Sequence, residues 1–461
     1  MPDPHRISTR LDTLPVTRFH RYVVAVVGIA TFFDLFDLFL ASSVSAVLQQ
    51  EFGVAGTELK LVLASAFIGA FAGALAIGRL ADRVGRRNAF LLTLALYSFF
   101  SMASAFSTDV WMLVVCRFLA GIGLGAELPL ADAYLADVLP PSARGRMTAW
   151  AYTLGFCGVP ASGFLARALL GEAPLGLAGW RWLFLIGALG AAIVWILRTN
   201  LPESPRWLAA TGRHDQAERV VRRFEKAAGR RAAPAAQSEP DSAPGEILPA
   251  RALLRPPWRR RTLMLYLFQL LQTFGYYGFG SLVPMVLAAK GFSLSHSLTF
   301  SAVSFLGYPL GSALSIPVIE RLQRKWLIVA SAVGMAVFGL AFGYASTGAA
   351  IAVFGFCYTA VSNVFSNAFH TYQGELFPTS VRAGAAGSAY ALSRLATAAM
   401  PFILIPVLDS FGPTALFTVV ASAMALLVVD VAVLGPRTTG LSVDEISSPR
   451  HDGASRARAP Y

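Results

Sequence analysis

The sequence predicts an all-α membrane protein of twelve transmembrane helices arranged as two similar halves. Hydrophobic residues make up 55% of the 461 positions and charged residues only 14%, which is more apolar surface than one soluble core can bury. Apolar runs of about 20 residues, the length that crosses the hydrocarbon layer as a helix, recur along the chain. Because these runs lack the alternation of a barrel strand, we expect helices to satisfy the backbone groups in lipid.

A repeat at an offset of 238 residues indicates that the chain is duplicated. The charge pattern from Gly78 to Arg87 returns between Glu320 and Lys325, again between two apolar runs. Other matching pairs are Tyr134 and Tyr372, Asp137 and Glu375, Pro140 and Pro378, and Tyr152 and Tyr390. Two parallel halves of this kind are typical of transporters that hold their substrate at the midplane of the membrane.

Each apolar run predicts one helix. The first six fall at about 21–48, 58–80, 88–107, 110–136, 147–171 and 180–199, and the second six at about 262–289, 298–319, 326–345, 349–373, 384–409 and 412–435. They divide the chain into an N-terminal tail (1–20), a first half (21–202), a central loop (203–261), a second half (262–435) and a C-terminal tail (436–461). Within the central loop, 206–229 is expected to form an amphipathic helix and the proline-rich segment 231–249 a flexible linker.

The net charge of +12 is a signal of topology rather than of nucleic-acid binding. Basic residues gather in the loops after helices 2, 4 and 8, while most of the loops between them carry one or none. Since positive loops stay on the inner side, both termini and the central loop are predicted to be cytoplasmic.

Four motifs carry a resemblance to a known family. They are Gly78 to Arg87 between helices 2 and 3, Arg117 to Gly125 in helix 4, Pro202 to Leu208, and Glu375 to Thr379. The chain resembles the major facilitator superfamily, and within it the sugar-porter and organic-ion branches (metabolite:proton symporters). The resemblance implies alternating access between two six-helix halves.

The charged loops are candidates for a gate on the inner side. Acids beside arginines at the ends of helices can form ion pairs and helix-dipole contacts that break and re-form as the halves rock. The alternative is that these charges set topology alone. The candidate gating residues are Asp82, Arg83, Arg86, Arg87, Arg144, Glu320, Arg321, Glu375 and Arg382, with Asp137 facing Arg144 and Glu375 facing Arg382.

Three acids within predicted helices are candidates for proton coupling. Asp34 and Asp37 lie three residues apart on helix 1, and Glu127 lies beside Pro129 in helix 4. An ionisable group at membrane depth is costly and normally faces a cavity or a partner. The alternative is a structural role, in which Arg117 anchors one of the helix 1 acids.

Arg394 in helix 11 is the main candidate for substrate binding. A guanidinium near the bilayer centre needs a counterion, which either a protein acid or a ligand can supply. The matching position in the first half is Phe156, so the charge is not part of the shared scaffold. Where the resemblance holds, a basic residue in this helix implies an organic anion. The expected pocket adds Gln269, Gln272, Tyr276, Asn363 and Tyr372.

These observations predict a proton-coupled symporter for a small organic anion such as an aromatic, heterocyclic or other carboxylate. A sugar or polyol porter, an efflux carrier for organic cations or drugs, and a non-transporting nutrient sensor are the alternatives. There is no GxxxxGK[ST] loop for ATP and no nucleophile–base pair or metal set, so we expect no cofactor, no metal and no enzymatic activity. A monomer in a bacterial inner membrane is expected, with lipid and substrate as its partners.

Overall fold

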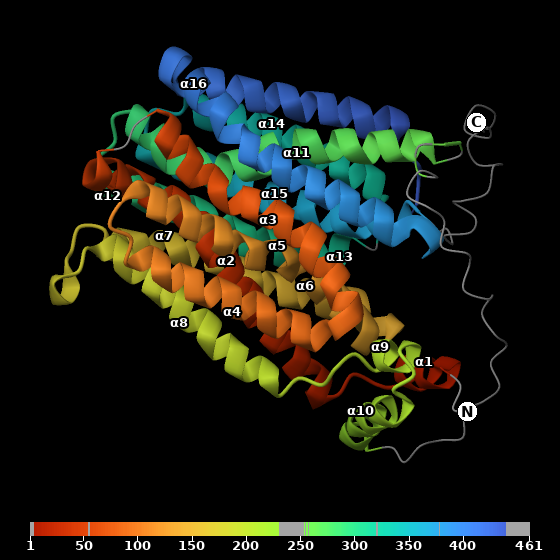
Figure 1. Cartoon of the computed structure of the whole chain (residues 1–461). Coiled ribbons are helices and arrows are strands. Elements are labelled where there is room, and N and C mark those ends of the chain that lie inside the picture. The colour runs from red at the N-terminus through yellow and green to blue at the C-terminus, as the bar shows by residue number, and fades with distance from the viewer. Residues whose placement is uncertain are drawn as a thin grey trace, which may run out of the picture.

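A computed structural model describes residues 4–53, 56–229, 253, 255–256, 258–319, 321–377 and 379–438, and the described chain is almost wholly α-helical (Figure 1). The first part of the chain holds α1 (Pro4–Asp12), α2 (Arg18–Phe52), α3 (Thr57–Val84), α4 (Arg86–Ala105), α5 (Val110–Val138), α6 (Pro141–Phe156), α7 (Gly158–Leu169), the 3₁₀ turn η1 (Pro174–Gly176), α8 (Gly179–Thr199), α9 (Pro205–Ala210) and α10 (His214–Ala227). The second part holds α11 (Arg259–Ala289), α12 (Leu294–Phe305), α13 (Gly307–Ile319), α14 (Arg324–Tyr344), α15 (Gly348–Glu375) and α16 (Thr379–Leu434).

Local signals fix several helix ends. α2 begins with a capping box, in which the Thr17 side chain accepts from the backbone N–H of His20 and the His20 ring bonds back to the N–H of Thr17. It ends at Gly53 in the left-handed conformation, which glycine adopts without strain. Asp109 caps the start of α5, and its carboxylate accepts from the N–H of Met112 at 2.9 Å.

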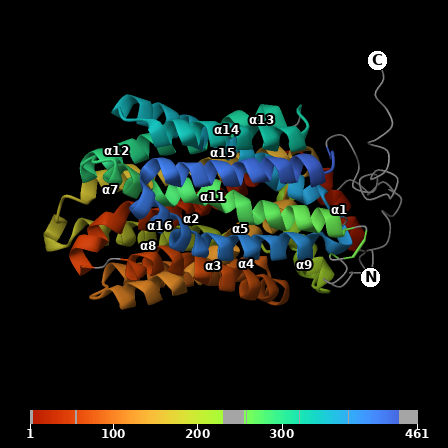
Figure 2. The same ribbon diagram turned by 90° about the horizontal axis from the view of Figure 1, so that it is seen from above.

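The bundle consists of two groups of helices. Figure 2 shows α3, α4 and α8 on one side and α13, α14 and α15 on the other, with α2 and α11 between them. Contacts between the groups join α2 to α11, α3 to α16, α6 to α13 and α7 to α12. At the 238-residue offset α3 corresponds to α12 and α13, and the first part of α16 corresponds to α6 and α7. The contact between α3 and α16 is therefore equivalent to the contacts of α13 with α6 and of α12 with α7. The duplication seen in the sequence is therefore also a duplication of packing.

Within each half, two glycines bring a pair of helices into backbone contact. A Cβ on Gly69 or Gly73 of α3 would meet the carbonyl oxygen of Phe118 or Ile122 on α5 at 2.0 Å. In the second half, Gly307 and Gly311 of α13 stand in the same relation to Phe356 and Ala360 on α15, at 2.3 and 2.1 Å. Each of these residues lies 238 positions after its equivalent in the first half. Small residues allow the close helix packing that stabilises membrane bundles.

The described residues contain nine candidate membrane spans by length and hydropathy. One of them, Ala385–Leu434, is 50 residues long and is interrupted at Gly412 (φ 81°), so it is far longer than one crossing requires. α6 and α7, of 16 and 12 residues, are not among the nine, and the glutamine-bearing α11 is also absent. The prediction of an all-helical membrane protein is confirmed, whereas the count of twelve is met only in part.

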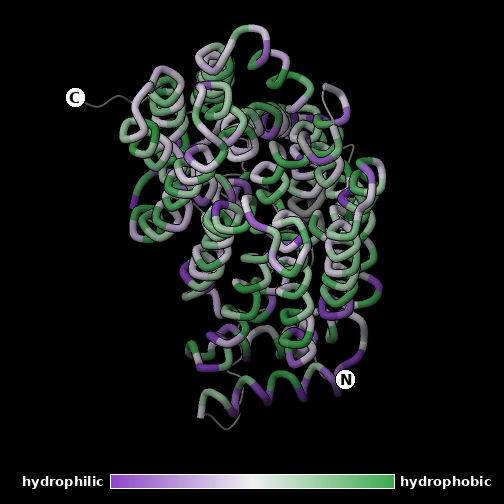
Figure 3. The backbone as a smooth tube through the Cα atoms, turned by 90° about the vertical axis from the view of Figure 1, so that its left-hand side faces the viewer, coloured by the Kyte–Doolittle hydropathy of each residue, from purple (hydrophilic) through white to green (hydrophobic). Residues whose placement is uncertain are grey.

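The outer surface of the bundle is apolar, as lipid contact requires. Figure 3, which looks roughly down the bundle, shows many turns of its helices coloured green for hydrophobic residues. Large apolar side chains point outward, among them Phe99, Leu189, Leu314 and Val337, each more than half exposed. A soluble protein would not display so many apolar side chains over its whole surface.

One end of the bundle carries a small extramembrane layer. The segment 206–229, predicted as one amphipathic helix, folds as two helices, α9 and α10, separated by a turn at Gly212 (φ 77°). The N-terminal tail contributes α1, whose Arg10 binds Glu218 and Glu225 of α10. Figure 1 shows α1, α9 and α10 together at this end. The predicted linker 231–249 lies outside the described residues.

Candidate transport site

A cavity lies between the two halves at the level where α5 faces α11, α15 and α16. Its inner chamber has a volume of about 310 Å³ and is bounded by Leu128, Pro129 and Asp132 of α5 and by aromatic and amide side chains of the second half. It adjoins a larger chamber of about 710 Å³, with which it shares Asp132, His370, Gln373 and Ala386.

The larger chamber opens at the end of the bundle that carries the basic loops. Arg144, Arg146 and Arg324 all line it, and they belong to the loops that the sequence predicts to be cytoplasmic. At the other end the halves are in contact. Ser42 of α2 donates to the carbonyl of Gly280 on α11 at 3.3 Å, and a pocket of about 10 Å³ lies beside this contact. The cavity is thus open on the side of the basic loops.

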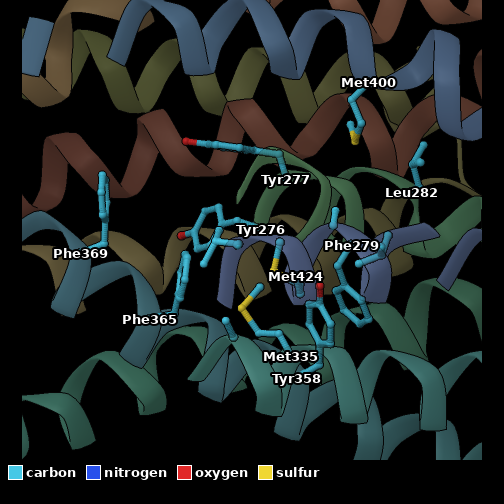
Figure 4. Close-up of a cluster of buried hydrophobic side chains, with 14 of the residues drawn as sticks. Tyr276, Tyr277, Phe279, Leu282, Met335, Tyr358, Phe365, Phe369, Met400 and Met424 are labelled. Atoms are coloured by element: carbon cyan, nitrogen blue, oxygen red, sulfur yellow. The ribbon is translucent and has the colours of Figure 1, made fainter. Parts of the chain in front are cut away.

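The predicted polar stripe of α11 faces this cavity. Gln269, Gln272 and Tyr276 all line the inner chamber. The Gln272 amide donates to the Gln269 side chain at 3.1 Å and to Ser393 Oγ at 3.0 Å, and the Gln269 amide donates to Gln373 at 3.3 Å. Figure 4 shows Tyr276 and Tyr277 on α11 near Phe365 and Phe369 of α15. The chamber therefore combines aromatic walls with amide groups.

Arg394 lies directly behind the wall of the inner chamber. Its guanidinium donates from Nη1 to Tyr277 Oη at 2.8 Å and from Nη2 to Tyr390 Oη, and both tyrosines line the chamber. The side chain is 3% exposed, and no carboxylate of the described residues forms an ion pair with it. Arg394 therefore reaches the cavity through two hydroxyl groups. Apart from its symmetry with Tyr152, Tyr390 was not indicated as a site residue by the sequence.

Two predicted pocket residues have other contacts. Asn363 is fully buried, donates to the carbonyl of Tyr308 and accepts from Tyr276 Oη at 3.3 Å, so it supports Tyr276 from behind. Tyr372 donates to the carbonyl of Pro436 at 2.8 Å and does not line either chamber. It corresponds to Tyr134, which donates in the same way to the carbonyl of Pro202. The assignment of Tyr372 to the pocket is corrected: it fastens the end of a helix.

Asp37 is paired with Arg117, which is the contact expected if Arg117 anchors one of the helix 1 acids. The Arg117 Nη1 donates to Asp37 Oδ2, its Nη2 donates to the Asp37 carbonyl at 3.2 Å, and both side chains are fully buried. Ser101 also donates to Asp37, at 3.1 Å. Both of these donors, Arg117 and Ser101, belong to the first half.

Glu127 is also paired, with a residue that the sequence analysis missed. The Arg198 guanidinium of α8 contacts Glu127 Oε1, and Thr93 donates to Oε2 at 3.0 Å. Arg198 lies over the Phe90 ring with its Cζ 4.0 Å from the ring centroid. Arg198 occupies the last turn of a predicted span, where an arginine is usually attributed to the membrane interface, and this is why its partner was not recognised.

Asp34 is the helix 1 acid without an ion-pair partner in the described residues. It is 6% exposed, and its Oδ2 atom has no hydrogen-bond donor in this structure. It lies within electrostatic range of Glu127, Arg198 and Asp37. Asp34 therefore belongs to a buried charged cluster in the first half.

Asp132 and His370 are two further groups in the cavity, and Asp132 was not among the predicted site residues. Tyr152 donates to Asp132 Oδ1 at 2.6 Å, and its ring stacks on the His370 ring with centroids 6.0 Å apart. Both Asp132 and His370 line both chambers. Their symmetry at the 238-residue offset was visible in the sequence, but the proximity of α5 and α15 was not.

The candidate gating residues form contacts within each half. Glu375 pairs with Arg324 at 3.2 Å. The equivalent acid, Asp137, accepts from Ser204 Oγ at 2.7 Å and lies within electrostatic range of Arg86, which is equivalent to Arg324.

The remaining gating candidates differ in their surroundings. Arg144 donates to the carbonyl of Leu139 at 3.2 Å and has no ion pair with Asp137, because its side chain turns back onto its own loop. Arg83 and Arg321 are exposed. The side chains of Asp82 and Arg382, together with Glu320, lie outside the described residues.

Glu203 occupies the N-terminus of α4, a place that the sequence analysis did not assign. Its carboxylate accepts from the backbone N–H of Arg87 at 3.1 Å and of Ser204 at 2.9 Å. Burial raises the pKa of Glu203, while these N–H groups act in the opposite direction. The Arg87 side chain donates to the Thr199 carbonyl at 2.5 Å. A Cβ on Gly85, whose φ is 99°, would lie 2.2 Å from this carboxylate, so the motif needs glycine here.

The comparisons with known proteins agree with this architecture. A family model described as "Sugar (and other) transporter" matches residues 20–448. A putative metabolite transport protein of Bacillus subtilis, YyaJ, is 34% identical, with 84% of this chain and 86% of that protein covered. The niacin transporter NiaP of Acinetobacter baylyi is 30% identical, with 95% and 99% covered.

Among solved structures, a partially occluded inward-open form of the Escherichia coli xylose transporter XylE superposes with a TM-score of 0.73 at 21% identity, covering 92% of this chain and 99% of that one. This likeness shows the major facilitator fold. The chain is a multi-pass integral membrane protein with bacterial inner-membrane homologues, and it is a transporter rather than an enzyme. By the match over residues 20–448, it belongs to the sugar (and other) transporter family of the major facilitator superfamily.

Proposed function

We propose that this protein is a proton-coupled symporter that imports a small organic anion, an aromatic or heterocyclic carboxylate, by alternating access. The observation that carries the proposal is the Arg394 guanidinium, which lies behind two hydroxyl groups that line the cavity. A buried guanidinium that contacts only neutral groups lacks a counterion. A carboxylate substrate supplies that charge.

Tyr277 and Tyr390 are the proposed direct contacts of the carboxylate. Each hydroxyl oxygen already accepts an N–H of Arg394, so its own proton is free to be donated into the chamber. Donors polarised by a charged neighbour form stronger hydrogen bonds to an anion. Two such donors side by side suit the two oxygens of a carboxylate, and Phe365 and Phe369 supply apolar surface for a ring.

The coupling proton is assigned to the buried acids of the first half. Asp37 and Glu127 are each neutralised by an arginine, whereas Asp34 has no such partner among the described residues. Asp34 is therefore the first choice for the proton, with Asp37 and Glu127 after it. Neutralising this cluster lowers the cost of reorienting the loaded carrier through a low-dielectric interior.

The proposed topology has twelve membrane passes with both termini in the cytoplasm of a bacterial cell, and the protein acts as a monomer. In this topology α6 and α7 together form one pass, α12 and α13 form another, and the two parts of α16 on either side of Gly412 form one pass each. The niacin transporter among the relatives carries a heterocyclic carboxylate, which supports the proposed substrate class.

Uptake into proteoliposomes tests the proposal. Labelled nicotinate, benzoate, xylose and a quaternary amine are offered with and without an inward pH gradient, with nicotinamide as the uncharged match for nicotinate. The proposal requires accumulation of a carboxylate that depends on the gradient and fails with Arg394→Ala. Accumulation of the amine would identify a cation carrier, and absence of uptake for the whole panel would favour the sensor alternative.

A sugar porter is the second candidate, because of the amides. Gln269, Gln272 and Gln373 all line the inner chamber and can bond to hydroxyl groups. The family description also names sugars first. Gradient-driven uptake of xylose without uptake of any carboxylate would replace the anion proposal by this one.

A further inference from the structure

Asp132 and His370 occupy equivalent positions in the two halves, 238 residues apart, and meet at the junction of the two chambers. Asp132 lies on α5 and His370 on α15, and the two side chains are close enough to interact electrostatically. Tyr152 bridges them, since it donates to Asp132 at 2.6 Å and stacks on the His370 ring. Nothing in the proposed binding of the carboxylate uses this pair.

Asp132 and His370 differ in chemistry from the other residues that line the open cavity. Among the described residues that bound the two chambers, Asp132 is the one carboxylate and His370 the one imidazole. The other charged groups nearby are Arg144, Arg146 and Arg324 in the larger chamber and Arg394 behind the inner one. The titratable groups that face the pair are the tyrosines Tyr152, Tyr276, Tyr277 and Tyr390. Arginine stays charged and tyrosine stays neutral between about pH 5 and 8.

Asp34, Asp37 and Glu127 do not line this cavity. Asp37 and Glu127 are enclosed in ion pairs with Arg117 and Arg198, and Asp34 is buried beside them. None of the three lines either chamber. A proton that enters or leaves the open cavity therefore meets Asp132 and His370 first.

We propose that Asp132 and His370 form a second proton-binding site, through which the inner compartment controls closure of the cavity. This proposal rests on proton coupling in the proposed function. When Asp132 is ionised and His370 carries a proton, the two groups attract each other across the halves and favour the conformation closed on this side. A further proton on Asp132, or loss of the proton from His370, removes the attraction and favours the open conformation.

The consequence is a bell-shaped dependence of closure on pH. The closed fraction rises as Asp132 ionises, and it falls again as His370 loses its proton. Closure is reversible, because the gain of one proton by Asp132 or the loss of one proton from His370 is enough to remove the attraction between the halves. The site thus links the occupancy of a proton to the geometry of the inner opening.

Distance measurements by pulsed electron paramagnetic resonance test the site without any substrate. Cys116, Cys157 and Cys357 are replaced, and spin labels are placed at Ser142 and Leu322, which are exposed on opposite halves. The protein is held in nanodiscs between about pH 4.5 and 8.5. The ratio of short to long distances is expected to pass through a maximum and to change by about fivefold or more across the range.

Variants of the pair identify the groups. Asp132→Asn should remove the acidic limb of the profile and His370→Gln the alkaline limb, while the exchange Asp132→His with His370→Asp should restore a maximum. Asp409→Asn, an exposed acid on α16, is the matched control and should keep the wild-type profile. A wild-type profile in both Asp132→Asn and His370→Gln overturns the proposal, as does a flat profile in the wild type.

The outcome is separate from that of the uptake experiment. A bell-shaped profile carried by the pair, together with uptake that ignores the pH gradient, would leave the site standing and refute proton-coupled symport. Gradient-driven uptake with a profile that ignores both variants would do the reverse.

Discussion

Arg198 of α8 contacts Glu127 of α5 in the interior of the first half, with both side chains no more than 2% exposed. The pair is sealed by the Phe90 ring on one side and by Thr93 on the other. Neither side chain lines either chamber in this structure. The pair therefore acts first as a structural link between two helices that are far apart in the sequence.

Glu127→Gln should destabilise the protein, because it leaves Arg198 as an uncompensated buried charge. Breaking a buried pair typically costs about 3–5 kcal/mol, whereas replacing both partners by neutral residues of similar volume is often tolerated. Thermal melting in detergent should show a clear decrease for Glu127→Gln and recovery in the double variant Glu127→Gln with Arg198→Met. Glu51→Gln, at an exposed position in the last turn of α2, is the control. Equal melting temperatures for all variants would contradict a structural pair.

Arg394→Ala should weaken binding of the native anion by on the order of a hundredfold or more, since breaking a buried charged contact costs several kcal/mol. Arg394→Lys should recover only part, because the lysine ammonium lacks the planar fork of donors with which the guanidinium bonds to Tyr277 and Tyr390. Binding is measured by isothermal titration or by quenching of tryptophan fluorescence. Tyr277→Phe and Tyr390→Phe should each lower affinity by about tenfold and leave the melting temperature almost unchanged. Tyr372→Phe, which removes a hydroxyl that donates to the Pro436 carbonyl and lines neither chamber, is the matched control.

Asp34→Asn should abolish uphill accumulation while substrate exchange across the membrane continues, because the variant cannot exchange a proton but keeps the volume of the side chain. Counterflow and gradient-driven uptake in proteoliposomes separate the two activities. If Asp34→Asn accumulates substrate like the wild type, the role of Asp34 is refuted. Asp37→Asn should instead lose stability, because Arg117 would be left unpaired.

The contact between α1 and α10 should depend on pH through Glu218. The Arg10 guanidinium lowers the pKa of Glu218, chiefly by a direct hydrogen bond. An acid with a lowered folded-state pKa stabilises the fold above its unfolded value of about 4.3, and this contribution is lost as the pH falls through the folded-state pKa. Hydrogen exchange in α1 should therefore show protection near neutral pH and loss of it below about pH 4. Glu218→Gln should reduce this dependence, whereas Glu172→Gln, an exposed acid on the opposite loop, should not.

Much of the fold could be predicted because lipid imposes a strong constraint on the sequence. Apolar runs, basic loops and the 238-residue repeat all reflect it, and the duplicated glycine contacts follow the same offset. The number of crossings was harder to confirm because α6, α7 and α11 are not among the candidate spans, and because two predicted helices join across Gly412 into α16.

The candidate site was predicted less completely, because its partners come from different helices. Arg394 and the glutamines of α11 stood out as polar groups at membrane depth. Tyr390 and Asp132 did not, since what matters is which group lies opposite them, and this depends on how the halves meet. Tyr372 was misassigned because a buried tyrosine can fasten a helix end as readily as it can line a pocket.

The glycine contacts between α3 and α5, and between α13 and α15, separate two ways in which this protein can fail. Where backbones touch directly there are no side chains to rearrange, so each half has little freedom to shear internally. Motion is then concentrated where α2 meets α11 and where α7 meets α12. Alanine at Gly69, Gly73, Gly307 or Gly311 would force helices apart and reduce the yield of assembled protein, whereas substitutions between the halves would alter turnover in protein that still assembles. Position alone would then distinguish a defect of assembly from a defect of the working cycle.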